Sequence, residues 1–570
     1  MTSDWKERRR RRVKRIRLLI AGTAVLMLIL LLALLVPSGK KISAADYFGL
    51  TEENQVGICA GTEKSETCGR IIDGNWYIDY ESIRSFSRAV WYDEEEKLAV
   101  AVSPVRKTVL DVSGGRSEDG EVVIADGILY IAVDFLLQAA DIEVTEYQEP
   151  YRIYVTEKRS YTAETVTFDA PVRQSPNIHS GIVTQLAEGD EVRTDEVTAD
   201  GAVTSEKNRG WTKVATPDGF VGYIRDSALE NPHEAEADYP NLAGEYTRIQ
   251  LDEPVNMVFH QVTDQATNNA LSEALEGVSG VNVIAPTWFF LDSGSGEITS
   301  LADSTYVENA HAAGLMVWAV LNDFDGAAAS AEETAEFLSH YSSRAMLIDR
   351  VMEELRASGA DGLNLDFELV TRDSAPAYIE FIRELSVELR NEGMTLSIDN
   401  YVPTYTGYMQ RGAQAEAADY IVVMCYDEHT SGSEEAGSVS SLSFVEKGIE
   451  DTLKEVPREQ VIAAIPFFTR LWITEKGGTP ESKAYGMESA EAALAEYGMT
   501  SVWDEKTGQY YAESEDGDLH YEMWLETVDS IAAKMEVIRR DGCAGAAEWK
   551  LGLEKAEVWE IIETGLSAES

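Results

Sequence analysis

Three polar side chains stand at every second position near the middle of the chain: Asn364, Asp366 and Glu368. In a β-strand, alternate side chains share one face, so all three would point to the same side. Two neighbouring carboxyl groups repel each other, and this repulsion raises the pKa of one of them. A carboxyl group that keeps its proton near neutral pH can donate it in acid–base catalysis. The alternative is structural, a helix N-cap and salt-bridge set that closes the loop after the strand.

The elements that would position these side chains are visible between residues 245 and 566, where apolar runs alternate with amphipathic helical stretches such as 375–392 and 523–540. Eight β/α units over this length predict a (β/α)8 TIM barrel, in which active sites lie at the C-terminal ends of the strands. Glu368 would then lie at the end of the fourth strand. The eight expected strands are residues 255–259, 281–285, 315–320, 362–367, 395–398, 420–424, 461–465 and 544–549.

The fourth strand resembles a known motif. With Asp361, its polar residues are similar to the DxxDxDxE signature of glycoside hydrolase family 18. Met424-Cys425-Tyr426-Asp427 resembles the family's Met-x-Tyr-Asp on strand six, and Trp549 resembles its tryptophan on strand eight. Residues 285–289, 465–472 and 523–526 are similar to the branch of spore-cortex-lytic and cell-wall N-acetylglucosaminidases. The resemblance covers all of residues 245–566.

The resemblance implies an enzyme that cleaves β-linked N-acetylglucosamine glycans, peptidoglycan or chitin-like, with retention of configuration. In this family the 2-acetamido oxygen of the substrate attacks the anomeric carbon. Glu368 would be the general acid and base, Asp366 would stabilise the oxazolinium ion, and Tyr426 would bind the acetamido group. No metal or organic cofactor is implied. The substrate-binding residues implied by the motifs, or expected from their place near strand ends, are Asn364, Met424, Asp427, Trp549, Trp288 and Arg470.

One position departs from the family pattern. Asn364 stands where the family has an aspartate that helps the next one, here Asp366, to turn by sharing charge or a proton. An amide donates and accepts hydrogen bonds but cannot take up a proton. Because Asp366 and Glu368 are both present, we expect an active enzyme. The alternative is a catalytically silent glycan-binding or scaffold protein of the cell envelope.

The N-terminus predicts a single-pass membrane anchor. Residues 1–17 hold nine basic residues against two acidic ones, and residues 18–36 carry no charge. Nineteen residues in a helix nearly span a bilayer core, and the positive-inside rule places residues 1–17 in the cytoplasm. The catalytic domain would then be extracellular and face the wall. The alternative is a cleaved signal peptide with a site near Ser43-Ala44-Ala45.

Two accessory modules are expected between the anchor and the barrel. Residues 41–157 contain a repeat, because Asp73-Gly74 and Asp126-Gly127 each open a strand that leads into a short helix, at 80–86 and 133–140. This module resembles the small α+β domain at the N-terminus of copper amine oxidases, without copper ligands. Residues 160–230 read as short strands of a small β-barrel that resembles bacterial SH3-like domains. Residues 230–242 read as a linker.

Charge and cysteine content limit the partners. The 570 residues carry a formal charge of −52, and residues 1–17 contribute +7, so the remainder carries about −59. Such an acidic body repels phosphate backbones, which excludes nucleic acid as a partner. Cys59 and Cys68 could form a disulfide or remain free thiols, and no histidine or cysteine spacing indicates a metal site. The expected partners are a polysaccharide substrate, the cell wall through the accessory modules, and the membrane.

Overall fold

The computed structural model describes residues 3–35, 37–194, 210–327 and 329–567. The chain divides into two compact units. The first is built from residues before 91 and from 110–243, and the second from residues 91–109 and the chain from 244 onward.

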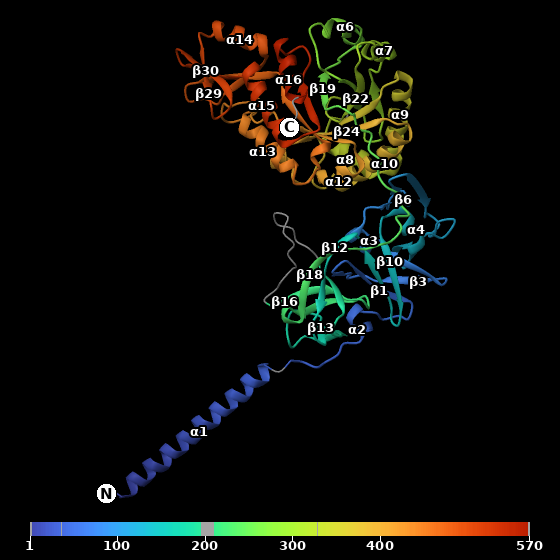
Figure 1. Cartoon of the computed structure of the whole chain (residues 1–570), viewed down its shortest axis with the longest axis vertical. Coiled ribbons are helices and arrows are strands. Elements are labelled where there is room, and N and C mark those ends of the chain that lie inside the picture. Colours follow the sequence, from blue (N-terminus) through green and yellow to red (C-terminus); the bar gives the residue numbers. More distant parts are fainter. Residues whose placement is uncertain (1–2, 36, 195–209, 328, 568–570) are drawn as a thin grey trace. The chain divides into compact units, whose positions relative to one another are not determined.

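The second unit contains the predicted barrel. Its eight parallel strands pair in the order β19-β32-β26-β25-β24-β23-β22-β20, and β19 also pairs with β20, so the sheet closes on itself. Figure 1 labels β19, β22 and β24 among them. Each strand overlaps one that the sequence predicted, and the (β/α)8 fold is confirmed. The strands are β19 (Val255–His260), β20 (Val283–Leu291), β22 (Met316–Asn322), β23 (Gly362–Asp366), β24 (Thr395–Tyr401), β25 (Tyr420–Met424), β26 (Val461–Pro466) and β32 (Gly545–Trp549), with β21 (Ile298–Ser300) antiparallel to β20.

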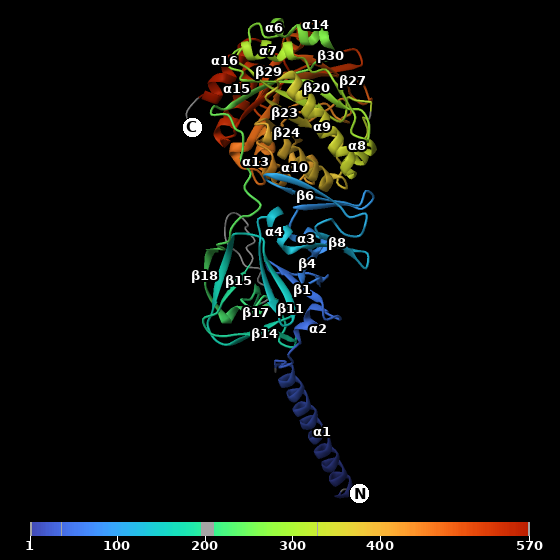
Figure 2. The same ribbon diagram turned by 90° about the vertical axis from the view of Figure 1, so that its right-hand side faces the viewer.

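Helices surround these strands, as Figure 2 shows for α8, α9, α10 and α13. In α10, the apolar residues Tyr378, Phe381, Ile382, Leu385 and Leu389 recur three or four positions apart, and they belong to the same buried cluster as the outward-facing Leu363 and Leu365 of β23. A second apolar cluster fills the barrel interior. The helices are α5 (Gln265–Asn269), α6 (Leu271–Ala274), α7 (Ser304–Ala312), α8 (Ala331–Ser339), α9 (Tyr341–Ser358), α10 (Ala375–Asn391), α11 (Pro403–Thr406), α12 (Arg411–Ala417), α13 (Leu442–Thr452), α15 (Val528–Asp541) and α16 (Glu557–Ser567).

An antiparallel sheet that the sequence analysis did not predict is inserted between β26 and α15. The expected helix 523–540 is wrong at its start, because residues 523–525 belong to the last strand of this sheet. Tyr521, Met523 and Leu525 are buried at every second position, which is strand periodicity, and α15 begins only after its N-cap Thr527. The inserted elements are β27 (Phe468–Glu475), β28 (Glu481–Gly486), α14 (Met487–Glu496), β29 (Thr500–Asp504), β30 (Gln509–Asp516) and β31 (Leu519–Leu525).

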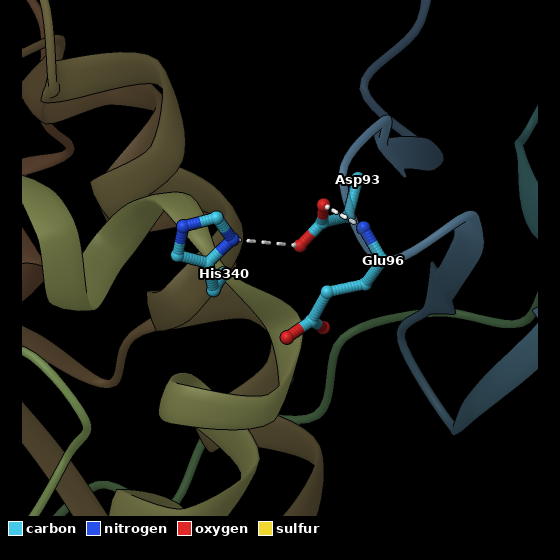
Figure 3. A group of neighbouring side chains, drawn as sticks. All are labelled: Asp93, Glu96 and His340. Atoms are coloured by element: carbon cyan, nitrogen blue, oxygen red, sulfur yellow. Dashed lines mark hydrogen bonds and ion pairs between the residues drawn. The ribbon is translucent and has the colours of Figure 1, made fainter.

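A three-stranded sheet from the N-terminal half of the sequence packs on the outside of the barrel, formed by β5 (Val90–Asp93), β6 (Leu98–Ser103) and β7 (Arg106–Asp111). Asp93 Oδ2 accepts the backbone N–H of Tyr341 at 3.0 Å, and Glu96 Oε2 accepts that of Ser342 at 3.0 Å. His340 lies 3.5 Å from Asp93 (Figure 3). The two carboxylates thereby satisfy N–H groups at the start of α9 that have no partner inside the helix.

The first unit holds both predicted accessory modules, apart from residues 91–109, which were predicted as part of the first module and belong to the second unit. The repeat is real: β4 and β9 pair with each other, and each leads into a short helix. Asp73 and Asp126, with the glycines that follow them, have positive φ, as a tight turn between β-strands requires. The module comprises α2 (Ala44–Phe48), β1 (Gln55–Ala60), β2 (Glu63–Lys64), β3 (Gly69–Ile72), β4 (Asn75–Asp79), α3 (Tyr80–Phe86), β8 (Val122–Ala125), β9 (Ile128–Ala132), α4 (Val133–Ala139), β10 (Glu143–Gln148) and β11 (Tyr151–Thr156).

The second module is a seven-stranded antiparallel sheet around a small valine-rich core. The linker expected at 230–242 begins later than predicted, because residues up to Glu236 pair with β12. The strands are β12 (Ser160–Val166), β13 (Ala170–Arg173), β14 (Ile182–Leu186), β15 (Glu191–Thr194), β16 (Trp211–Ala215), β17 (Val221–Arg225) and β18 (Leu229–Glu236).

The N-terminal segment forms helix α1 (Ser3–Leu35). The predicted transmembrane stretch, residues 18–36, falls partly outside the described side chains. In the part of the chain that the structure describes, no helix has the length and apolar character needed to cross a membrane. All four cysteines lie in the described part and are free thiols, so Cys59 and Cys68 are unpaired.

Candidate active site

The inner face of β23 carries the alternating polar residues that the sequence predicted. Asn364 is fully buried, and its Nδ2 donates to Asp399 Oδ1 at 2.8 Å and to Ser397 Oγ at 3.0 Å on β24. Asp366 is 5% exposed, while its neighbours Leu363 and Leu365 pack outward under the helices. The polar stack therefore points into the barrel, at the end where a (β/α)8 fold places its chemistry.

Glu368 is held by contacts with two neighbouring strands. Its backbone N–H donates to Asp323 Oδ1 at 2.9 Å, and Asp323 Oδ2 accepts the hydroxyl of Thr334 at 3.0 Å. Asp323 follows β22 and is completely buried, so it anchors the start of the loop that carries Glu368. On the other side, the hydroxyl of Tyr401 donates to Glu368 Oε2 at 2.5 Å. The carboxyl group is thus fixed at the mouth of the barrel.

The surroundings of Glu368 suit a proton donor. Burial raises the pKa of this carboxyl group to about 7, and the hydrogen bond from Tyr401 opposes the rise. The negative charges of Asp323 and Asp427 add to it. A group with this pKa is largely protonated in slightly acidic solution and can accept the proton back near neutral pH. This is the protonation behaviour that a general acid and base needs.

Two further carboxyl groups lie deeper in the barrel. Burial raises the pKa of Asp366 well above its ordinary value, and the charges of Asp399 and Glu368 add to the rise. Burial also raises the pKa of Asp399 above its ordinary value, although its hydrogen bond from Asn364 acts in the opposite direction. Buried carboxyl groups this close cannot all be ionised, so protons are shared among them.

Residues at the ends of β25 and β32 complete the site. Tyr426 is 6% exposed, and the charges of Asp399 and Asp366 act on its hydroxyl, whose pKa is raised first of all by burial. Asp427 follows with a positive φ of 59°, and the charge of Arg470 opposes the rise that burial causes in its pKa. The half-buried ring of Trp549 lies 5.4 Å from that of Phe259, centroid to centroid.

Most of the predicted site residues therefore gather at one end of the barrel. Met424 is buried among the interior side chains next to Tyr426, and Arg470 comes from β27 of the inserted sheet. Trp288 does not belong to the site. Its indole is fully buried between the barrel and α7 and donates to Asn268 at 2.9 Å, so its expected role in substrate binding is wrong.

Two site residues were missed from the sequence. Asp399 occupies the middle of the series Ser397, Asp399 and Tyr401, whose alternation on β24 matches that on β23 and could have revealed it. Asp323 had no comparable signal, because it follows its strand in a loop and acts on a backbone N–H 45 residues away.

Comparisons with known proteins agree with the motif. Residues 326–554 match the family model "Glycosyl hydrolases family 18", and residues 172–229 match "Bacterial dipeptidyl-peptidase Sh3 domain". The resemblance of residues 41–157 to copper amine oxidases stays a prediction. The chain is 25% identical over 256 residues to the "Cortical fragment-lytic enzyme" of Bacillus subtilis, which covers 43% of the chain and 58% of that enzyme.

Two more relatives extend this picture. The "Uncharacterized glycosylase YvbX" of Bacillus subtilis is 23% identical over 335 residues, 56% of the chain and 94% of that protein. The spore cortex-lytic enzyme SleL of Bacillus cereus has the same fold, with a TM-score of 0.50 at 19% identity over 59% of the chain and 77% of its own. The chain spans less than two thirds of the length of several curated relatives that it matches, 58% in the case of the cortical fragment-lytic enzyme.

Proposed function

Because the chain carries a glycoside hydrolase domain of family 18, we propose that the protein cleaves β-linked N-acetylglucosamine glycans with retention of configuration and with help from the substrate's own acetamido group. The observation that carries the proposal is Glu368, a half-buried acid with a pKa near 7 at the end of β23. Asp366 lies two residues before it on the same face. One group of a suitable pKa and a second carboxyl beside the reacting sugar are what this mechanism needs.

Each side chain then has one task. Glu368 gives its proton to the glycosidic oxygen as the bond to the anomeric carbon breaks and the acetamido oxygen attacks that carbon. The resulting carboxylate takes a proton from the water that opens the oxazolinium ring, which restores the acid. Asp366 accepts the acetamido N–H and places negative charge beside the oxazolinium cation. Tyr426 donates to the acetamido group, and Trp549 offers an apolar face to the sugar ring.

Peptidoglycan is favoured over chitin as the substrate. One line of support is domain content, because the same chain carries a match to a bacterial SH3 domain. The other is similarity, because relatives of the barrel are named for the lysis of spore cortex. The accessory modules would hold the enzyme at the wall. This choice rests on similarity and domain content, since the site residues would serve either glycan.

We also propose that the catalytic body lies outside the cytoplasmic membrane, with residues 18–36 as its anchor and residues 1–17 in the cytoplasm. Its support is the basic segment followed by an uncharged one. Protease added to intact cells should cut after β18, within residues 237–243, and release a soluble barrel. Protection of the barrel until the membrane is opened would contradict this location.

Asn364 favours a second candidate function, glycan binding without hydrolysis. The two functions separate in one assay, in which the full chain is incubated with N-acetylglucosamine oligomers and with the same oligomers after de-N-acetylation. The proposal predicts cleavage of the acetylated oligomer alone, with β-anomeric product in the first NMR spectra. Binding without cleavage would support the silent protein, and cleavage of the de-N-acetylated oligomer would contradict the acetamido mechanism.

A further inference from the structure

A second carboxyl group lies beside Asp366 on the inner face of the barrel, and the mechanism above gives it no part. Asp399 belongs to β24, and its side chain is 2% exposed. In the parallel ladder between β23 and β24, Leu365 lies opposite Ile398, and the next residue along each strand is one of these two aspartates. They therefore face the barrel interior at the same level on adjacent strands.

The hydrogen bonds of the two acids are unequal. Asp399 Oδ1 accepts the amide N–H of Asn364 at 2.8 Å. Among the described residues, Asp366 Oδ1 is buried and has no hydrogen-bond partner. The charges that act most strongly on Asp366 are all negative, from Asp399, Glu368 and two aspartates that follow β22. Two buried anions side by side are costly, so the pair keeps a proton, and the amide of Asn364 favours Asp399 as the charged member at rest.

We propose that Asp366 and Asp399 share one proton, and that Asp399 acts as the proton partner of Asp366, a part that the amide at position 364 cannot play. This inference rests on the proposed function. At rest the proton is on Asp366, and Asp399 is the carboxylate that accepts from Asn364. When the positively charged sugar intermediate forms, the proton crosses to Asp399 and Asp366 becomes the carboxylate beside the cation.

The transfer is balanced. One O–H bond breaks on Asp366 and one forms on Asp399, and the pair carries a charge of −1 before and after the step. The proton returns to Asp366 when water opens the oxazolinium ring and the cation is gone. Asp399 touches neither substrate nor water in this scheme, so it is a positioning residue that sets the charge of Asp366.

Several other titratable groups face this pair, and they shape its pH dependence. Glu368 follows the strand that ends at Asp366, and Tyr401 lies on the same strand as Asp399. The others are Asp323 and Asp325 after β22, Tyr426 after β25, and Tyr378 of α10. Because most of these groups become negative as pH rises, loss of the shared proton is resisted in neutral solution. The double variant Asn364→Asp/Asp399→Asn keeps these neighbours constant.

The first test compares variants of the full chain on N-acetylglucosamine oligomers. Asp399→Asn should lower kcat by about tenfold or more with little change in KM, since proton-transfer partners contribute at least this much. The double variant Asn364→Asp/Asp399→Asn reverses the amide–carboxyl hydrogen bond and should recover kcat to within a few fold. Wild-type kcat and pH profile in Asp399→Asn would overturn the proposal, and so would a double variant as slow as the single one.

The second test needs no turnover. Infrared difference spectra at pH 7 between the wild-type chain and Asp366→Asn/Asp399→Asn count the carboxyl groups lost. The proposal predicts one protonated and one ionised group. A loss of two protonated or of two ionised groups would overturn it. If the wild-type chain cleaves no glycan, the proposed function fails, and this count alone decides whether the pair shares a proton.

Discussion

The hydroxyl of Tyr401 donates a 2.5 Å hydrogen bond to Oε2 of Glu368 and so links the end of β24 to the carboxyl group that follows β23. In a protonated carboxyl group the carbonyl oxygen is the stronger acceptor, so this bond favours Oε1 as the oxygen that carries the proton of Glu368. The bond also restricts the direction in which that proton is presented. Two strand ends thus determine the geometry of one proton transfer.

Replacing this donor should change both rate and pH profile. Tyr401→Phe removes a hydrogen bond that lowers the pKa of Glu368, so the alkaline limb of the rate profile should move to higher pH. We expect kcat to fall by about tenfold, because the carboxyl group loses its fixed direction. The half-exposed Tyr405 offers a matched control, since Tyr405→Phe should leave both values unchanged. An unshifted profile in Tyr401→Phe would show that the bond is absent in solution.

The wild-type pH profile tests the raised pKa of Glu368. Burial stabilises the protonated form, and catalysis begins with that form, so kcat/KM should be constant on the acid side of about pH 7 as far as this group is concerned. Above pH 7 it should fall about tenfold per pH unit. Initial rates on a soluble oligomer between pH 5 and 9 check this. Rates that stay level to pH 9 would exclude a proton donor with this pKa.

Asp323 should act on Glu368 in the opposite direction from Tyr401. Its negative charge raises the pKa of Glu368, so Asp323→Asn should move the alkaline limb to lower pH. The amide keeps an acceptor for one backbone N–H but loses the bond from Thr334, which should cost about 1–3 kcal/mol in the free energy of unfolding. Urea unfolding and rate profiles of the same preparation measure both effects. A shift to higher pH would refute this electrostatic assignment.

The three-stranded sheet β5–β7 should contribute to the stability of the fold without affecting catalysis. Asp93→Ala removes the acceptor for the N–H of Tyr341 at the start of α9, and we expect a loss of about 1 kcal/mol in the free energy of unfolding. The exposed Glu94, next in the chain, is the control, and Glu94→Ala should be neutral. Thermal or urea unfolding separates the two variants, with kcat expected to match the wild type in both. Equal stability would mean that Asp93 does not cap α9.

The sequence predicts the barrel and the polar stack of β23 because both follow from the spacing of residues that are close together in the chain. Eight apolar runs gave the strands, and alternation at 364, 366 and 368 gave the inward face. The inserted sheet was missed because the strand ending at Leu525 runs directly into the helical pattern of α15. Trp288 was misplaced because a position near a strand end does not tell whether a side chain points into the barrel or under a helix.

The contacts that tune the site lie beyond such patterns. Asp399 bonds to Asn364 across 35 residues and Asp323 to Glu368 across 45, and only strand pairing brings them together. The departure at Asn364 was visible in the sequence, while the placement of Asp399 beside it was not. The contact between Asn364 and Asp399 depends on the register between β23 and β24, and local residue spacing does not determine that register.

The most direct test of the central assignment is the turnover of Glu368→Gln measured beside the wild type and Glu435→Gln, a control on an exposed residue. Glutamine has nearly the same shape but no proton of suitable pKa, so the full chain should fold normally, bind N-acetylglucosamine oligomers, and lose at least about 10²-fold in kcat. Glu435→Gln should retain full activity. If Glu368→Gln cleaves the oligomers or wall glycan as fast as the wild type does, Glu368 is not the acid and the proposed mechanism is wrong.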